Sequence, residues 1–102
     1  MTSNDFSASA TSELRPVIGL TRGLPGPDME VLAVNAIRLH RQLLEKADQL
    51  FQALPQDYKI GKAAGGQQHL EYIEAMIEMH AQMSALNALV ELLGYIPKVS
   101  VN

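Results

Sequence analysis

The sequence predicts an all-α fold in which two long antiparallel helices form a hairpin, with an extended N-terminal arm and a short C-terminal tail. Two stretches without proline or glycine, residues 28–54 and 67–93, are rich in residues that favour helices. Pro55 ends the first stretch, and the pair Gly65–Gly66 precedes the second. Each helix spans roughly 26 residues, or about 40 Å. A connection of this length favours an antiparallel hairpin.

A single small domain is expected from the 102 residues. Residues 1–12 contain mainly Ser, Thr and Ala without any period and are predicted to be disordered. The domain (13–102) then comprises the arm (13–26), the first helix (27–54), a loop (55–66), the second helix (67–93) and the tail (94–102). The net charge of −3 disfavours a surface built for nucleic acid or anionic lipid.

A cytoplasmic protein without membrane contact is the expected class. The N-terminus carries no basic region followed by an apolar run, so no signal peptide is expected. No apolar run reaches the roughly 18 residues that a transmembrane helix needs. The chain contains no Cys, which excludes disulfides, thiolate catalysis and Cys-based zinc sites.

The arm carries apolar side chains that need a docking place. Residues 13–27 contain three Pro and three Gly, which argue against a regular helix. The five apolar residues are Leu14, Val17, Ile18, Leu20 and Leu24. The arm either packs along the helices of its own chain or, alone or in addition, binds a partner with Arg15 and Arg22 as polar anchors.

The second helix contains an apolar stripe with flanks that change character midway. The stripe consists of Tyr72, Met76, Met79, Met83, Leu86, Val90 and Leu93, in steps of four and three. In the first half, the flanks carry Leu70, Ile73 and Ile77 on one side and Glu71, Glu74 and Glu78 on the other. In the second half, the glutamate flank becomes Ala85, Leu89 and Leu92. The second helix therefore needs two neighbours on different sides.

Two helices share one contact line, and each helix here offers a wider apolar face. If the apolar surface outside this contact line stayed exposed, it would form a larger apolar patch than soluble monomers usually tolerate. Pairing two hairpins into a four-helix bundle, as a symmetric homodimer, would bury it. The expected core of the hairpin and its dimer consists of Leu39, Leu43, Leu50, Phe51, Ile73, Met76, Ile77, Met79, Met83, Leu86, Leu89, Val90 and Leu93.

No residue pattern supports catalysis, and no catalytic, cofactor or metal site is predicted. The Glu-x-x-His spacing of di-iron bundles is absent, because Glu78 and His80 lie two residues apart. Gly61–Lys62 lacks the further residues of a phosphate-binding loop. We expect a polar layer that fixes the helix register, formed by His40, His80, Ser84 and Asn87.

Several runs of residues resemble the TraM family of quorum-sensing antiactivators. In the arm they are ELRP (13–16) and IGLTRGLP (18–25). In the first helix they are EKAD (45–48) and FQALP (51–55), and the second helix carries YIEA (72–75) and IEMHAQMSALN (77–87). The tail adds IPKV (96–99). The similarity spans residues 13–102, and runs of this length are specific.

The resemblance implies a dimer of two-helix protomers that binds TraR, a LuxR-type activator responding to an acyl-homoserine lactone. It implies that the antiactivator blocks the DNA binding of the activator and so represses conjugal transfer genes. No direct DNA binding and no small-molecule ligand are expected. The candidate partner-binding residues are Leu14, Arg15, Pro16, Ile18, Leu20, Arg22, Glu71, Glu74, Glu78, Tyr95, Ile96 and Lys98.

Two alternative functions belong to other classes. A small dimeric helical mutase would need several inward-facing basic residues for a dicarboxylate, whereas Arg38 and Arg41 are predicted to face outward. A helical dimer that binds DNA directly is disfavoured by the negative net charge.

Overall fold

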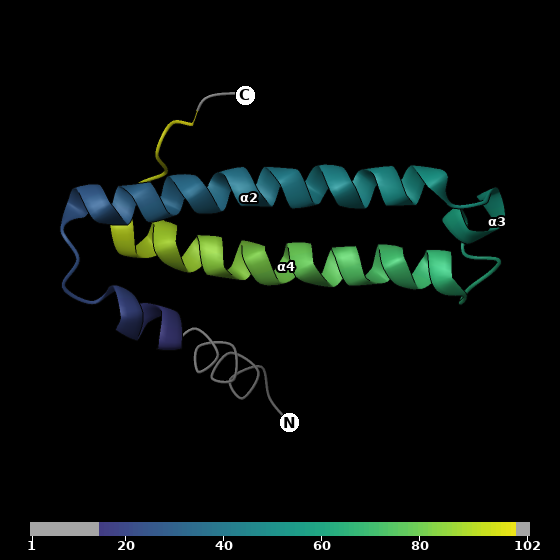
Figure 1. Ribbon diagram of the computed structural model, residues 1–102, viewed down its shortest axis with the longest axis horizontal. Helices are drawn as coiled ribbons and strands as arrows, with labels where there is room; N and C mark the ends of the chain where they lie inside the picture. Colours follow the sequence, from purple (N-terminus) through teal and green to yellow (C-terminus); the bar gives the residue numbers. More distant parts are fainter. Residues whose placement is uncertain (1–14, 100–102) are drawn as a thin grey trace.

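Two long helices lie side by side and antiparallel in the computed structural model, which describes residues 15–99 (Figure 1). Helix α2 spans Gly26–Ala53, the short helix α3 spans Gln56–Lys59, and α4 spans Gln67–Leu93. The described residues contain no strand. The predicted all-α hairpin is therefore confirmed. Residues 1–12, predicted to be disordered, lie outside the part of the chain that the structure describes.

Helix α2 begins and ends within one residue of its predicted bounds. Pro27 lies in the first turn, where its missing N–H leaves no hydrogen bond unmade. The N–H of Asp28 donates to the Pro25 carbonyl at 3.1 Å, and its carboxylate suits the positive end of the helix dipole. Leu54 is extended, with φ −67° and ψ 144°, as is common for a residue that precedes proline.

The connection between the long helices contains one turn of helix, α3, within the segment predicted as loop. Four residues are too few to display a period, which is why the pattern did not reveal α3. Beside this turn, the side-chain amide of Gln68 donates to the Ala53 carbonyl at 2.9 Å, which satisfies one of the orphan carbonyls at the end of α2. The rings of Phe51 and Tyr72 lie 5.5 Å apart and join the two helices near this end.

Helix α4 spans the predicted residues and ends at Gly94. Gly94 adopts the left-handed conformation, with φ 94°, and its N–H donates to the Val90 carbonyl at 2.9 Å. Glycine is favoured there because it has no Cβ to strain the backbone. At the other end, the N–H of Gly65 donates to Nδ1 of His69 at 2.8 Å.

Small side chains form much of the contact between α2 and α4. The buried hydrophobic residues of the described chain are Met29, Ala33, Ala36, Leu43, Ala47, Leu54, Ala75, Met79, Ala88 and Leu89. Five of these ten are alanines, and none of the described large side chains is fully buried. A single hairpin thus has a thin core, as expected when only two helices share one contact line.

The residues predicted for the core of the hairpin and its dimer fall into three groups. The hairpin itself buries Leu43, Met79 and Leu89. It half-buries Leu50, Phe51, Met76, Met83, Leu86, Val90 and Leu93. It leaves Leu39, Ile73 and Ile77 exposed. The prediction for these last three residues concerns a dimer, which a single chain does not test.

The prediction of an extended arm is wrong for residues 15–21, which are helical. Pro16 lies in the first described turn of this arm helix, where proline is tolerated. Gly23, with φ 82°, and Pro25 follow the end of the helix, so that only Gly19 lies inside it. The Thr21 hydroxyl donates to carbonyls of the preceding turn, at 3.0 Å in the nearer case. The position of each Pro and Gly, rather than their number, decides the conformation.

Candidate functional site

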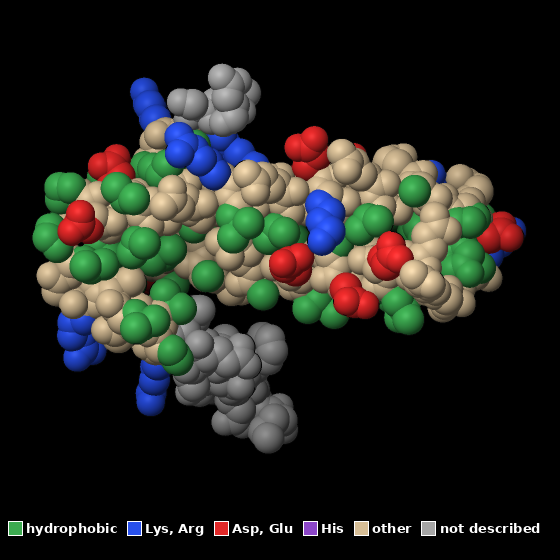
Figure 2. Space-filling view, viewed as in Figure 1, with side chains coloured by type: hydrophobic (Ala, Val, Ile, Leu, Met, Phe, Trp, Pro, Cys, Tyr) green, Lys and Arg blue, Asp and Glu red, His purple; other side chains and the backbone are tan. Residues whose placement is uncertain are grey.

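Three glutamates line the side of α4 that borders α2. Glu71, Glu74 and Glu78, here called the acidic row, follow spacings of three and four residues, so they share one side of the helix. All three are exposed. Together with Lys46 and Leu50 of α2 they line a shallow depression. Figure 2 shows acidic side chains gathered on this half of α4.

The acidic row is only weakly neutralised within the chain. Lys46 Nζ lies 3.8 Å from the Glu78 carboxylate, and both side chains are 59% exposed. The side-chain amide of Gln67 donates to Glu71 at 3.2 Å. An exposed ion pair of this kind contributes about 0–1 kcal/mol. The carboxylates can therefore exchange these contacts for stronger ones with a partner at little cost.

Exposed aliphatic side chains run beside the acidic row. Leu70, Ile73 and Ile77, here called the outer apolar row, lie farther from α2, at helical positions next to the glutamates. Leu70 is 53% exposed and Ile77 is 64% exposed. The combination of carboxylates with an apolar row is a surface suited to an amphipathic, basic partner.

The arm helix docks on the second half of α4. Val17 packs against a buried cluster of Met29, Ala33, Ala36 and Leu89. Ile18 and Thr21 line a small cavity with Leu92. The flank of α4 that changes from glutamate to aliphatic residues thus finds its second neighbour in the chain's own arm.

The other arm residues predicted to bind a partner point into solvent or are half-buried. Arg15, Pro16, Leu20 and Arg22 are exposed, Leu20 to 83%, whereas Ile18 is half-buried. Leu14 lies outside the described residues. The arm therefore packs on its own chain and still exposes the side chains of Arg15, Leu20 and Arg22.

The tail crosses the first half of α2 and then extends away from it (Figure 1). Pro97 is buried. Partial desolvation, the negative charge of Glu30 and a hydrogen bond from the Tyr95 hydroxyl to the Glu30 carboxylate raise the pKa of Tyr95 above its usual value. Ile96 and Lys98 remain exposed. Tyr95 and Pro97 thus hold the tail on the hairpin, whereas the side chains of Ile96 and Lys98 are exposed.

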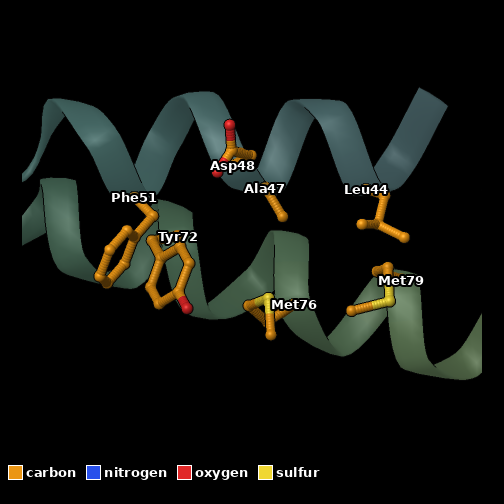
Figure 3. Close-up of a pocket in the computed structure, with 7 residues that line it drawn as sticks. All are labelled: Leu44, Ala47, Asp48, Phe51, Tyr72, Met76 and Met79. Carbon is orange, nitrogen blue, oxygen red and sulfur yellow. The ribbon is translucent and has the colours of Figure 1, made fainter. Parts of the chain in front are cut away.

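An apolar groove lies on the opposite side of the contact line from the acidic row. This groove, here called the seam groove, has a volume of about 280 Å³ and is lined by Leu44, Ala47, Asp48, Phe51, Tyr72, Met76 and Met79. Figure 3 shows the side chains of α2 and α4 converging on it, with the Asp48 carboxylate directed away from Met76 and Met79. Leu44 is 47% exposed.

The groups needed for a metal site are not brought together in the described residues, where no cluster of three potential ligands occurs. The predicted polar layer is wrong for His80, Ser84 and Asn87, which are exposed. The Ser84 hydroxyl instead donates to the His80 carbonyl of its own helix at 3.3 Å.

Among residues 15–99, no helix combines the length and the apolar character that a membrane span requires.

Sequence reasoning missed three features of these surfaces. Ala75 and Ala88 are buried although they lie outside the predicted stripe. The buried position of Pro97 in the tail and the seam groove are the other two. Helical spacing indicates which residues share a side but not how closely two helices approach, so the alanine contact and the groove beside it could not be derived from it.

Comparisons with known proteins agree with the helical arrangement. The family model for the prokaryotic transcriptional repressor TraM matches residues 1–98. A transcriptional repressor TraM from Rhizobium radiobacter is 64% identical over 98 residues, which are 96% of this chain and 96% of the relative. A protein of the same name from Agrobacterium fabrum is 61% identical over 102 residues, covering both chains completely.

A solved structure shows a similar fold. It is the crystal structure of a second quorum-sensing antiactivator, TraM2, from A. tumefaciens strain A6. The superposition gives a TM-score of 0.84 with 82% sequence identity, and it covers 86% of this chain and 99% of the solved chain.

Proposed function

The chain belongs to the TraM family of prokaryotic transcriptional repressors and is not an enzyme, and from this membership we propose that it is an antiactivator of quorum sensing. It binds a TraR-like activator of the LuxR type and blocks the binding of that activator to promoter DNA. Conjugal transfer genes then stay off until the activator exceeds the inhibitor. The similarity to TraM2, a quorum-sensing antiactivator, supports this assignment.

The observation that carries the proposal is the acidic row beside the outer apolar row on α4. A DNA-binding domain must be basic where it meets the phosphates. Carboxylates of Glu71, Glu74 and Glu78 can pair with such basic groups, while Leu70 and Ile77 bury apolar area. Occupying this basic surface would exclude DNA by direct competition.

The arm and the tail supply further contacts in this proposal. Arg15, Leu20 and Arg22 project from the arm helix, and Ile96 and Lys98 project from the tail. These groups lie at the far end of the hairpin from α3 (Figure 1). We propose that they extend the contact with the activator beyond the acidic row, with Tyr95 holding the tail in place through Glu30.

The inhibitor acts as a homodimer in the cytoplasm, where its activator meets DNA. The thin core of the single hairpin supports association, because no described large side chain is fully buried. The net charge of −3 supports a protein that contacts the activator rather than DNA.

A pull-down with the purified activator, loaded with its acyl-homoserine lactone, tests the proposed function. The antiactivator is expected to retain the activator in the absence of DNA. Added promoter DNA should reduce the amount retained, because both compete for the basic surface. Failure to retain the activator at micromolar concentrations, with or without DNA, would contradict the proposal.

A further inference from the structure

The side of α4 that points away from α2 carries apolar residues along most of its length. Met79 is buried where α4 meets α2. Leu70 and Ala88 each lie nine residues from Met79, or about two and a half turns of helix, so both point away from α2. Ile77 and Ala81 lie on the same side, because each is two residues, or about 200°, from Met79. This side of α4, from Leu70 to Ala88 and the turn after it, is here called the outer face.

The second half of the outer face is covered by the arm helix. Ala88 is 5% exposed although it points away from α2. The arm helix lies on this side of α4 (Figure 1). Ile18 and Thr21 line a cavity of about 260 Å³ with Leu92, one turn after Ala88, and Val17 packs against the neighbouring buried cluster. The chain itself thus shows that the outer face can receive a helix.

The arm helix is amphipathic and basic. Val17, Ile18 and Thr21 lie within about 100° of one another around the helix axis, and all three are half-buried. Arg15 and Arg22 lie on the opposite side of the arm helix and are exposed. The seven residues 15–21 are therefore enough to place a helix on the outer face, because they offer it aliphatic side chains.

The first half of the outer face is also aliphatic, but it is exposed. It carries the outer apolar row, of which Leu70 is 53%, Ile73 is 36% and Ile77 is 64% exposed. Glu74 lies between this row and α2, one helical turn after Leu70. An exposed aliphatic strip with carboxylates along one edge is complementary to an amphipathic helix that carries basic residues on one flank.

We propose that an amphipathic helix of the activator packs on the outer apolar row, along α4 and in line with the arm helix, with its basic flank against the acidic row. This inference rests on the proposed function and names the structural element of the activator that these two rows receive. Ala81 follows Leu70 by 11 residues, or about 16 Å. About three turns of a partner helix match this length, with apolar residues spaced as i, i+3 or i+4, and i+7.

Two features favour a helix over an extended segment as the occupant. The backbone groups of α4 are paired within the helix, so they offer no ladder of hydrogen bonds to an added strand. Ala81, at the end of the strip nearest to the arm helix, has a small side chain that allows close approach of a second helix, as Ala88 does beneath the arm helix. The arm helix runs from Leu92 toward the first half of α4 (Figure 1), so the activator helix continues its line.

Affinity for the activator loaded with its acyl-homoserine lactone, measured by isothermal titration calorimetry, tests the role of the outer apolar row. The double variant Leu70→Ser and Ile77→Ser removes its two most exposed aliphatic side chains. The matched control is Ile60→Ser, at an isoleucine that is 53% exposed after α3. Circular dichroism checks that the helices are retained. The double variant should bind at least tenfold more weakly than the wild type, and the control within twofold. An unchanged affinity of the double variant, or an equal loss in the control, would overturn the proposal.

Photo-cross-linking shows whether the element bound there is a helix. The chain contains no Cys, so the variants Leu70→Cys and Ala81→Cys each carry a single thiol for a short photoreactive label. In the complex, the two labels should attach to one segment of the activator at positions about 11 residues apart, because a helix rises about 1.5 Å per residue. An extended segment would place these positions about five residues apart. That shorter spacing, or attachment to two separate segments, would overturn the proposal.

Failure of this inference and failure of the proposed function give different results. A wild-type chain that does not bind the activator would remove both. A double variant that binds and inhibits like the wild type would remove the helix site alone and leave the antiactivator function standing.

Discussion

Reversing the three charges of the acidic row tests the proposed activator contact most sharply. In the triple variant Glu71→Lys, Glu74→Lys and Glu78→Lys the net charge changes from −3 to +3. The fold should survive, because all three side chains are exposed. Among the described residues, the ion pair that this change removes joins Glu78 to Lys46 at 3.8 Å, and it contributes about 0–1 kcal/mol.

Binding to the activator should weaken much more than folding. Each exposed pair with a basic partner is worth about 0.2–1 kcal/mol, and reversal replaces attraction with a repulsion of similar size. A total loss of at least about 1 kcal/mol corresponds to roughly fivefold in affinity. The loss should shrink at high salt, because exposed charges are screened.

Fluorescence anisotropy of labelled promoter DNA, with the activator bound, measures the inhibitory concentration of each variant. A matched control reverses three other exposed acids, Glu45, Asp57 and Glu91, and reaches the same net charge of +3. The control should inhibit nearly as well as the wild type. An acidic-row variant that inhibits as well as its control would refute the assignment of this surface.

Three further predictions concern stability. Leu54→Ala, at a site 4% exposed, should lower the free energy of unfolding by about 2–5 kcal/mol, measured by urea denaturation. A loss below about 1 kcal/mol would show that Leu54 is not packed at the end of α2. Ala33→Leu, at a site 0% exposed, should lower the free energy of unfolding by about 1–3 kcal/mol, also measured by urea denaturation. An unchanged midpoint of urea denaturation would contradict the close contact of α2 with its neighbours. Because the pKa of Tyr95 is raised in the fold, its contribution to stability is fully present below its usual pKa of about 10 and is lost as pH rises through the raised value. Tyr95→Phe should remove this alkaline dependence in thermal denaturation, and an identical pH profile in both proteins would exclude the Glu30 contact.

The hairpin could be predicted from the sequence because its limits are set by local chemistry. Pro55 ends α2 one residue after an extended Leu54, and Gly94 ends α4 in the left-handed conformation. These residues act through their own backbone geometry and need no knowledge of the fold. Both long helices could therefore be placed to within one residue.

The arm and the contact line depend on tertiary arrangement and are less predictable. Of the two prolines of the arm, Pro16 lies in the first described turn of the arm helix and Pro25 lies beyond its end, so composition alone gives the wrong conformation. The need of α4 for a second neighbour follows from its changing flanks. Only the packed structure shows that the arm supplies part of this second neighbour, because Val17 packs against the cluster that contains Leu89.

The acidic row can be found from spacing alone, because three glutamates at steps of three and four must share a side of a helix. The residues of α2 that lie next to the acidic row cannot be predicted from spacing. That Lys46 of α2 forms an ion pair with it, and that the seam groove lies on the opposite face, depends on how α2 and α4 are rotated against each other.

Titration of the activator–DNA complex with the wild-type antiactivator tests the central claim most directly. Anisotropy of the labelled promoter should fall to that of free DNA, with an end point near one antiactivator chain per activator chain. The antiactivator alone should leave the anisotropy of the DNA unchanged. DNA that stays bound at tenfold excess of the antiactivator, or an antiactivator that binds the DNA itself with a steep salt dependence, would contradict the claim.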